Sequence, residues 1–114
     1  MPAPAERWEA DVGDLGVAHL DIPPDARRDR RFEVSVDFSV VAFTDADDAW
    51  HALRVLVDGA QQWTRRVPTL AEGGDGLDWR VQHLVPAGQP LRVAAITEVH
   101  RARRLKLRVV AEEA

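Results

Sequence analysis

The chain has 114 residues, of which 46% are hydrophobic and 30% charged, and its formal net charge is −4. This length fits one domain with a core of its own, and the composition is that of an ordinary globular protein. The absence of cysteine excludes disulfide scaffolds, thiolate zinc sites and cysteine nucleophiles, and no apolar run is long enough to cross a membrane.

The N-terminal sequence MPAPAERWEADVGD lacks the basic start and the apolar stretch of a secretory signal peptide, so we expect a cytoplasmic protein. All basic residues except Lys106 are arginine, and neither asparagine nor tyrosine occurs. This bias is typical of the GC-rich codon usage of a bacterium. The abundance of arginine is therefore only weak evidence for nucleic-acid binding.

Residues 1–31 are predicted to form an extended N-terminal arm, and residues 32–114 a single domain. Prolines and glycines interrupt the arm, so no helical period extends through it. Apolar residues between Leu15 and Ile22 predict a short extended piece that lies on the domain. The mixed charges of residues 25–31 predict a solvated hinge.

The first regular element is a strand over residues 32–43. Phe32, Val34 and Val36 begin an apolar row at every second position, and polar residues occupy the positions between them. Strict alternation indicates a strand that is buried on one face. The solvated second face favours an antiparallel sheet.

The next segment, residues 45–63, is predicted to form an amphipathic helix. Thr44 is a favourable N-cap, and aspartates fill the first turn, where the helix dipole stabilises negative charge. Apolar residues recur at spacings of three and four from Ala46 to Trp63. Residues 64–78, with Pro68 and a glycine-rich run, then predict an irregular connection.

The last third of the chain predicts strands over residues 79–85 and 91–99, joined by a hairpin turn at 86–90. A turn near residues 100–103 would separate a further strand, although the alternation also permits one long bent strand from 91 to 110. The predicted fold class is therefore α+β. An antiparallel sheet of three to four strands, in the order β-α-β-β with an optional last strand, is packed by one helix.

Basic residues concentrate in this last third, which carries seven Lys or Arg and three acids. The candidate basic surface for an acidic protein partner or a nucleic acid consists of Arg101, Arg103, Arg104, Lys106 and Arg108. The alternative interpretation is structural, since arginines on an outer strand face pair with acids such as Glu33 and Asp37 on a neighbouring strand. The net negative charge of the chain favours that alternative.

No catalytic constellation is visible in the sequence. Asp47 and His51 lie one helical turn apart in the predicted helix, which is typical of a surface hydrogen-bonded pair rather than a metal site. Both serines lie on the outer face of one predicted strand, without a neighbouring base. We therefore expect no metal and no cofactor, and the balance is against an enzyme.

Trp8 in the arm and Trp79 at the start of a strand are candidate interface or pocket aromatics, because tryptophan is enriched at both kinds of site. One helix also leaves long strands and part of the apolar sheet face uncovered. The leading hypothesis is a non-enzymatic interaction protein that forms a homo-oligomer, without a membrane partner. The alternatives are a nucleic-acid-associated regulator that uses the basic residues, and a small-ligand-binding oligomer or enzyme with an interface pocket.

Overall fold

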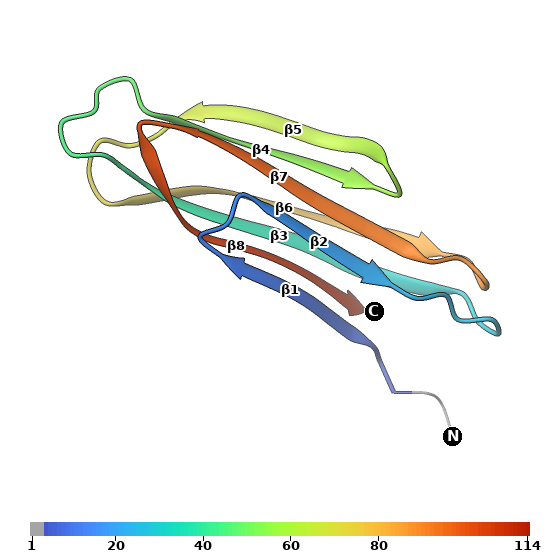
Figure 1. Ribbon diagram of the computed structural model, residues 1–114. Helices are drawn as coiled ribbons and strands as arrows, with labels where there is room; N and C mark the ends of the chain where they lie inside the picture. The colour runs from blue at the N-terminus through green and yellow to red at the C-terminus, as the bar shows by residue number, and fades with distance from the viewer. Residues whose placement is uncertain (1–3) are drawn as a thin grey trace.

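The computed structural model describes residues 4–114, which contain eight β-strands and no helix, and therefore no helix that could span a membrane (Figure 1). The strands are β1 (Arg7–Gly13), β2 (Val17–Ile22), β3 (Arg30–Ala42), β4 (Trp50–Val57), β5 (Ala60–Pro68), β6 (Gly74–Val85), β7 (Leu91–His100) and β8 (Ala102–Glu113).

The strands form two stacked antiparallel sheets. Sheet A has the order β1-β8-β3-β6, and sheet B has the order β2-β7-β4-β5. Only the β4–β5 connection stays within one sheet, and every other connection crosses between sheets. This connectivity is that of an eight-stranded jelly roll. The start of β1 pairs with the end of β8, so both lie at the same end of the sandwich, which we call the terminal end; the opposite end is the loop end (Figure 1).

The predicted α+β class is wrong, because the helix expected over residues 45–63 does not form. This segment contains β4 and most of β5, which are joined by the turn Asp58-Gly59. It carries two periodicities at once: a stripe at three-to-four spacing and a strict alternation at 51, 53, 55 and 57, the buried positions of β4. Asp-Gly between alternating apolar residues is a strong hairpin signal, and both turn residues have positive φ, 51° and 82°.

The other expected strands form, with longer boundaries. Residues 32–43 correspond to β3, and residues 79–85 and 91–99 lie within β6 and β7. The turn near residue 100 exists: Arg101 has φ 53°, and there the chain passes from sheet B to sheet A. The connection predicted over 64–78 is wrong in its outer parts, since β5 extends to Pro68 and β6 begins at Gly74.

The segment predicted as an arm contains β1 and β2, which form the edges of sheet A and sheet B on the same side of the sandwich. Its first three residues lie outside the described part of the chain. Alternate side chains of both sheets meet in a single core that includes Ile22, Phe32, Val36, Leu53, Val93 and Leu107. Trp8 packs against this core from β1.

A polar network closes the terminal end. Arg28 binds Glu6 (2.7 Å), Asp25 (3.2 Å) and the C-terminal-strand residue Glu113. Arg30, only 2% exposed, donates to Glu6 (3.0 Å) and to the carbonyl oxygen of Pro23 (2.9 Å). The network therefore joins the segment before β1, the β2–β3 linker and the end of β8.

The hydrogen bond from Arg28 holds the pKa of the Glu113 carboxyl below its ordinary value. The ionised carboxylate thus stabilises the fold at neutral pH, and this contribution is lost as pH falls from about 5 through the folded-state pKa. We expect the thermal unfolding midpoint of the natural protein to fall more steeply between neutral and acidic pH than that of Glu113→Gln. Glu112→Gln, at the neighbouring exposed side chain, should follow the natural protein; equal pH profiles for all three proteins would contradict this assignment.

Gly59 offers a test of the β4–β5 hairpin that replaces the predicted helix. A Cβ at this position meets no atom within 4 Å, so Gly59→Ala isolates the backbone cost of φ 82°. We expect a loss of about 1 kcal/mol in the free energy of unfolding by urea. Gly74→Ala is the matched control, since Gly74 is equally open but lacks a positive φ. A helix would instead be stabilised by Gly59→Ala, so a gain in stability would refute the hairpin.

Candidate functional site

A β-bulge divides the predicted basic surface between two faces of sheet A. Ser39 of β3 pairs with Lys106, whereas the next residue, Val40, pairs with Arg104. Leu105 is the extra residue and is 44% exposed. Lys106 and Arg108 therefore project from the outer face of β8, while Arg104 shares the inward side of the buried Val40.

Arg104 is part of the packing at the loop end. Its Nε donates to Thr97 Oγ1 (2.8 Å), and its Nη2 donates to the Thr97 carbonyl oxygen (3.1 Å). Its guanidinium also fills the space in which Gly16 lacks a Cβ. These contacts fix Arg104 between β7 and the β1–β2 turn, so it is not available as a surface cation.

Two more of the predicted basic residues are engaged in ion pairs. Arg101 binds Asp48 at 2.8 Å, and Arg108 binds Glu9 on β1. Arg103 and Lys106 are exposed, but they belong to opposite sides of the bulge. The five residues therefore do not form one continuous basic surface for a phosphate backbone or an acidic partner.

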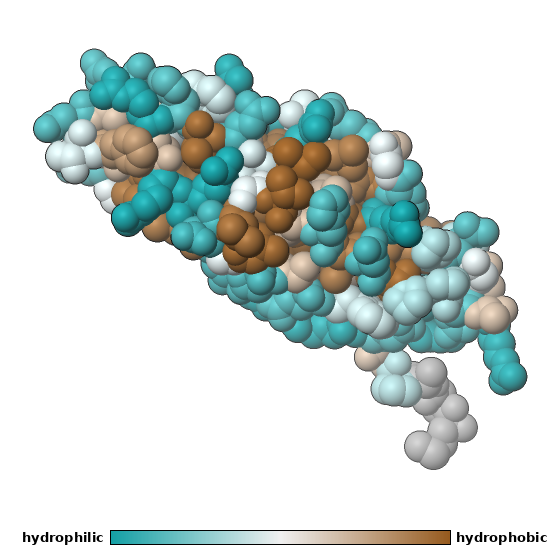
Figure 2. Space-filling view, viewed as in Figure 1, coloured by the Kyte–Doolittle hydropathy of each residue, from teal (hydrophilic) through white to brown (hydrophobic). Residues whose placement is uncertain are grey.

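The outer faces of the two sheets differ in character. On sheet A, ion pairs link neighbouring strands, such as Arg7–Glu112 (2.9 Å) and Arg80–Glu33 (3.5 Å). On sheet B, four outward-facing apolar side chains are neighbours in the strand register: Val17, Leu56, Ala94 and Ile96. Figure 2 shows hydrophobic residues gathered in the middle of the face over β2, β7 and β4, with polar residues around them.

The two candidate tryptophans occupy different environments. The Trp8 indole donates to Glu6 Oε1 at 3.0 Å, which ties it to the polar network of the terminal end. Trp79 lies on β6, at the edge of sheet A, where it pairs with Val36 of β3 and is partly buried against the core. Trp79 therefore remains available to an interface, whereas Trp8 is held within the fold.

The edge of β6 differs from the other three sheet edges within residues 4–114. β1 has a register shift between Asp11 and Gly13, β2 is six residues long, and β5 has a register shift and ends at Pro68. β6 pairs with β3 over all twelve of its residues without a shift, and it contains no proline. Bulges, prolines and short length protect a sheet edge, and β6 has none of these three features. Its charged residues are Asp75 on the inward row, and Asp78 and Arg80 on the outer face.

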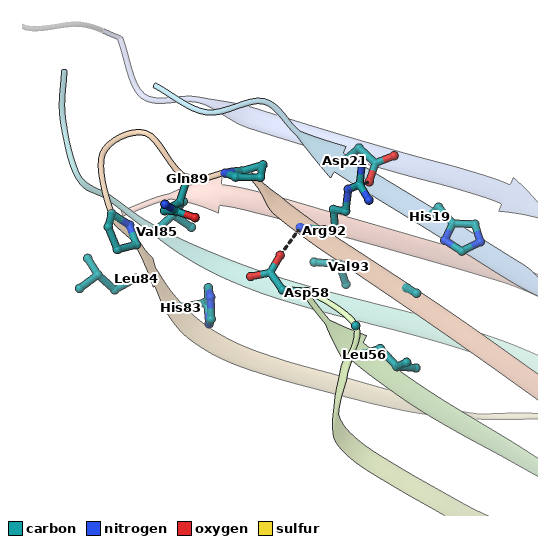
Figure 3. A pocket seen from close by; sticks show the side chains of 14 residues that line it. His19, Asp21, Leu56, Asp58, His83, Leu84, Val85, Gln89, Arg92 and Val93 are labelled. Carbon is teal, nitrogen blue, oxygen red and sulfur yellow. Dashed lines mark hydrogen bonds and ion pairs between the residues drawn. The ribbon is translucent and has the colours of Figure 1, made fainter. Parts of the chain in front are cut away.

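A cavity of about 820 Å³ lies at the terminal end, between the β4–β5 turn, the end of β6 and the start of β7 (Figure 3). Its polar lining includes the side chains of Asp58, His83 and Gln89, and Asp21 and Arg92 form an ion pair at its rim (3.6 Å). The sequence pattern alone did not indicate this cavity, because it depends on how the two sheets stack. The Asp58-Gly59 hairpin signal was the one local clue.

His51 does not form the surface pair with Asp47 that the helix predicted. Its side chain is fully buried in β4, where Nδ1 lies 2.7 Å from Thr69 Oγ1 and the ring packs edge-on against Phe38. Among residues 4–114, no three His, Asp, Glu or Cys side chains are grouped so that they could hold a metal ion. His51 is therefore a hydrogen-bonded core histidine.

No protein-family profile matches the chain, and a search of curated proteins finds no match. Among solved structures, dimeric latent PorU from Porphyromonas gingivalis has a TM-score of 0.52 and 9% identity, over 93% of this chain. The chain spans only 11% of PorU. This likeness concerns the fold alone.

Two other solved structures have TM-scores below 0.5. A family 35 carbohydrate-binding module from an environmental isolate has a TM-score of 0.45 and 16% identity, covering 85% of this chain and 67% of the module. An exo-β-1,3-galactanase from Phanerochaete chrysosporium has a TM-score of 0.44 and 12% identity, covering 94% of this chain and 27% of the enzyme. These similarities are distant, and they leave the function of this chain open.

The structural role of Arg104 can be tested against its exposed neighbour. Arg104→Met removes both hydrogen bonds to Thr97, and we expect the free energy of unfolding by urea to fall by about 1–3 kcal/mol. Arg103→Met removes an exposed cation and should change it by less than about 0.5 kcal/mol. Equal effects of the two substitutions would show that Arg104 is not part of the packing.

Proposed function

We propose that this protein is a non-enzymatic interaction protein that self-associates by antiparallel pairing of β6 with β6 of a second copy. The observation that carries this proposal is the long, regular edge of β6. Twelve residues in regular register leave a row of backbone N–H and C=O groups on the side away from β3, and such a row is a template for another strand.

Apolar side chains accompany this backbone edge. Val81 and Leu84 on β6 are 36% and 53% exposed, although both are large hydrophobic residues. Leu77 and Trp79 are partly buried against the core from the same strand. Pairing with a second copy would cover the inward members of this set, and the burial of apolar surface adds to the new backbone hydrogen bonds.

The charges on β6 favour one register for the pairing. In an antiparallel pair of strands, residues that lie opposite each other face the same side of the sheet. Two strands related by a two-fold axis therefore pair so that one residue lies opposite its own copy, and the axis passes between these two residues. With the axis at Trp79, Asp78 lies opposite Arg80 of the second copy, and Arg80 opposite Asp78. An axis at Asp78 or at Arg80 instead places like charges opposite each other, which is destabilising.

The same register is favourable on the inward face. It places Trp79 opposite its own copy and Leu77 opposite Val81 of the second copy, and both are apolar pairs of the kind that stabilise sheets. Nearer the ends of the strand, Asp75 lies opposite His83. The pairing would join the two copies of sheet A into one eight-stranded sheet.

Exchange of the two charges tests both the pairing and its register. Asp78→Arg and Arg80→Asp should each raise the dimer dissociation constant roughly 5- to 30-fold, since symmetry places two like-charge pairs in the interface. The double exchange restores opposite charges and should recover most of the affinity. Sedimentation equilibrium over a range of concentrations measures all four proteins, and thermal unfolding confirms that each is folded.

Single cysteines give a second test, because the natural chain has none. A mixture of Asp78→Cys and Arg80→Cys proteins should form a disulfide-linked heterodimer under mild oxidation, whereas each protein alone should crosslink poorly. A natural protein that stays monomeric at millimolar concentration would overturn the proposal. A dimer that ignores the charge exchange would show that it associates through another surface.

A further inference from the structure

We infer that the cavity at the terminal end is a binding site for a small organic cation, an ammonium group carried on an apolar body. The central residue is Asp58, in the β4–β5 turn. Its N–H donates to the Arg92 carbonyl oxygen (2.8 Å), and its Oδ1 accepts the Arg92 N–H (2.9 Å). These two bonds fix the turn against β7 and orient the carboxylate.

The second oxygen of Asp58 has no hydrogen-bond or ion-pair partner among residues 4–114. Figure 3 shows this oxygen on the side of the cavity, with the His83 ring and the Gln89 amide around the same hollow. Neither of these two side chains has a hydrogen bond to the protein within the described residues. Three polar groups, from the β4–β5 turn, strand β6 and the β6–β7 turn, thus line one space without hydrogen-bonding one another, and those of Asp58 and Gln89 are exposed to solvent.

The rest of the lining is largely apolar. Val85 and Val93 are 2% and 1% exposed and form the deep part of the wall, and Pro86 and Pro90 flank it. An apolar wall with a few polar groups, in a volume between about 300 and 1,000 Å³, is the usual character of a small-molecule site. The cavity therefore suits a ligand with an apolar body of modest size.

The charge of the site selects the polar end of that ligand. Asp21 and Arg92 form an ion pair at the rim (3.6 Å) and offset each other, so the net charge of the lining at neutral pH comes from the carboxylate of Asp58. The imidazoles of His19 and His83 also line the cavity. A cationic donor would form a charge-assisted hydrogen bond with the Asp58 carboxylate, roughly twice as strong as a neutral one, whereas an anion would be repelled. Asp58 and its turn lie outside β6, whereas His83 lies on β6, and the proposed pairing would place it opposite Asp75 of the second copy.

Three probes of one shape and different charge test the site: benzylamine, which is a cation at neutral pH, benzyl alcohol and benzoate. In a ¹H–¹⁵N NMR titration, benzylamine should produce saturable shifts at Asp58, Gly59, His83 and Gln89. It should bind roughly tenfold more tightly than benzyl alcohol, a difference that corresponds to one charge-assisted hydrogen bond. Benzoate should bind more weakly than either.

Asp58→Asn is the decisive variant, because asparagine tolerates the positive φ and its amide oxygen can still accept the Arg92 N–H. It should bind benzylamine no more tightly than benzyl alcohol. Asp47→Asn, an exposed aspartate at the loop end, is the matched control and should bind like the natural protein. No saturable shifts with any probe, shifts at other residues, or an amine preference that survives Asp58→Asn would overturn the inference.

Discussion

A buried guanidinium holds the terminal end of the sandwich together. Arg30 opens β3 and is only 2% exposed, and it donates to Glu6, to the Pro23 carbonyl and, at 3.5 Å, to the Gln89 carbonyl. A buried charge is tolerated only where it is paired and hydrogen-bonded, so these acceptors must be in place together. These acceptors belong to the segment before β1, the β2–β3 linker and the β6–β7 turn.

The β2–β3 linker also contacts the β6–β7 turn directly, because the Ala87 N–H donates to Asp29 Oδ1 (2.8 Å). The wall of the cavity is thus fixed by the residues that close the fold.

The connectivity explains why the sandwich is open on one side. Because every connection except β4–β5 crosses between the sheets, β1 and β2 become edges on one side and β5 and β6 on the other. On the first side, β1 and β2 pack against each other across the two sheets. On the second side, β5 and β6 make much less contact with each other. The side with less contact between its edge strands is also the side that has the regular edge of β6.

The sequence predicted β3 and β7, where long alternation was the only periodicity, but it missed β1 within the predicted arm and was wrong where two periodicities overlapped. Alternation in β3 and β7 was sufficient, whereas residues 50–57 fit both a helical stripe and an alternating strand, and the helical interpretation was wrong. Leu105 fits the same alternation as Leu107 and Val109, so the sequence does not mark it as the extra residue of a bulge. The bulge, which turns Arg104 inward, depends on the pairing of β8 with β3. Trp79 could be proposed as an interface residue from its type alone. Its position on an edge, and the cavity beside Asp58, arise from long-range pairing that no local pattern contains.

The protection of the other three edges strengthens the argument from β6. A shift, a proline or a short strand costs regular hydrogen bonds, and proteins accept that cost because an open edge promotes uncontrolled association. Pairing of β6 with its own copy avoids this hazard, since a two-fold interface uses both edges at once and leaves none to extend the assembly on that side. Sheet B cannot extend in the same way, because β5 carries the shift opposite Val55 and Leu56 and ends in Pro68. With one long regular edge among four, the proposed pairing would therefore give a closed dimer rather than a fibre.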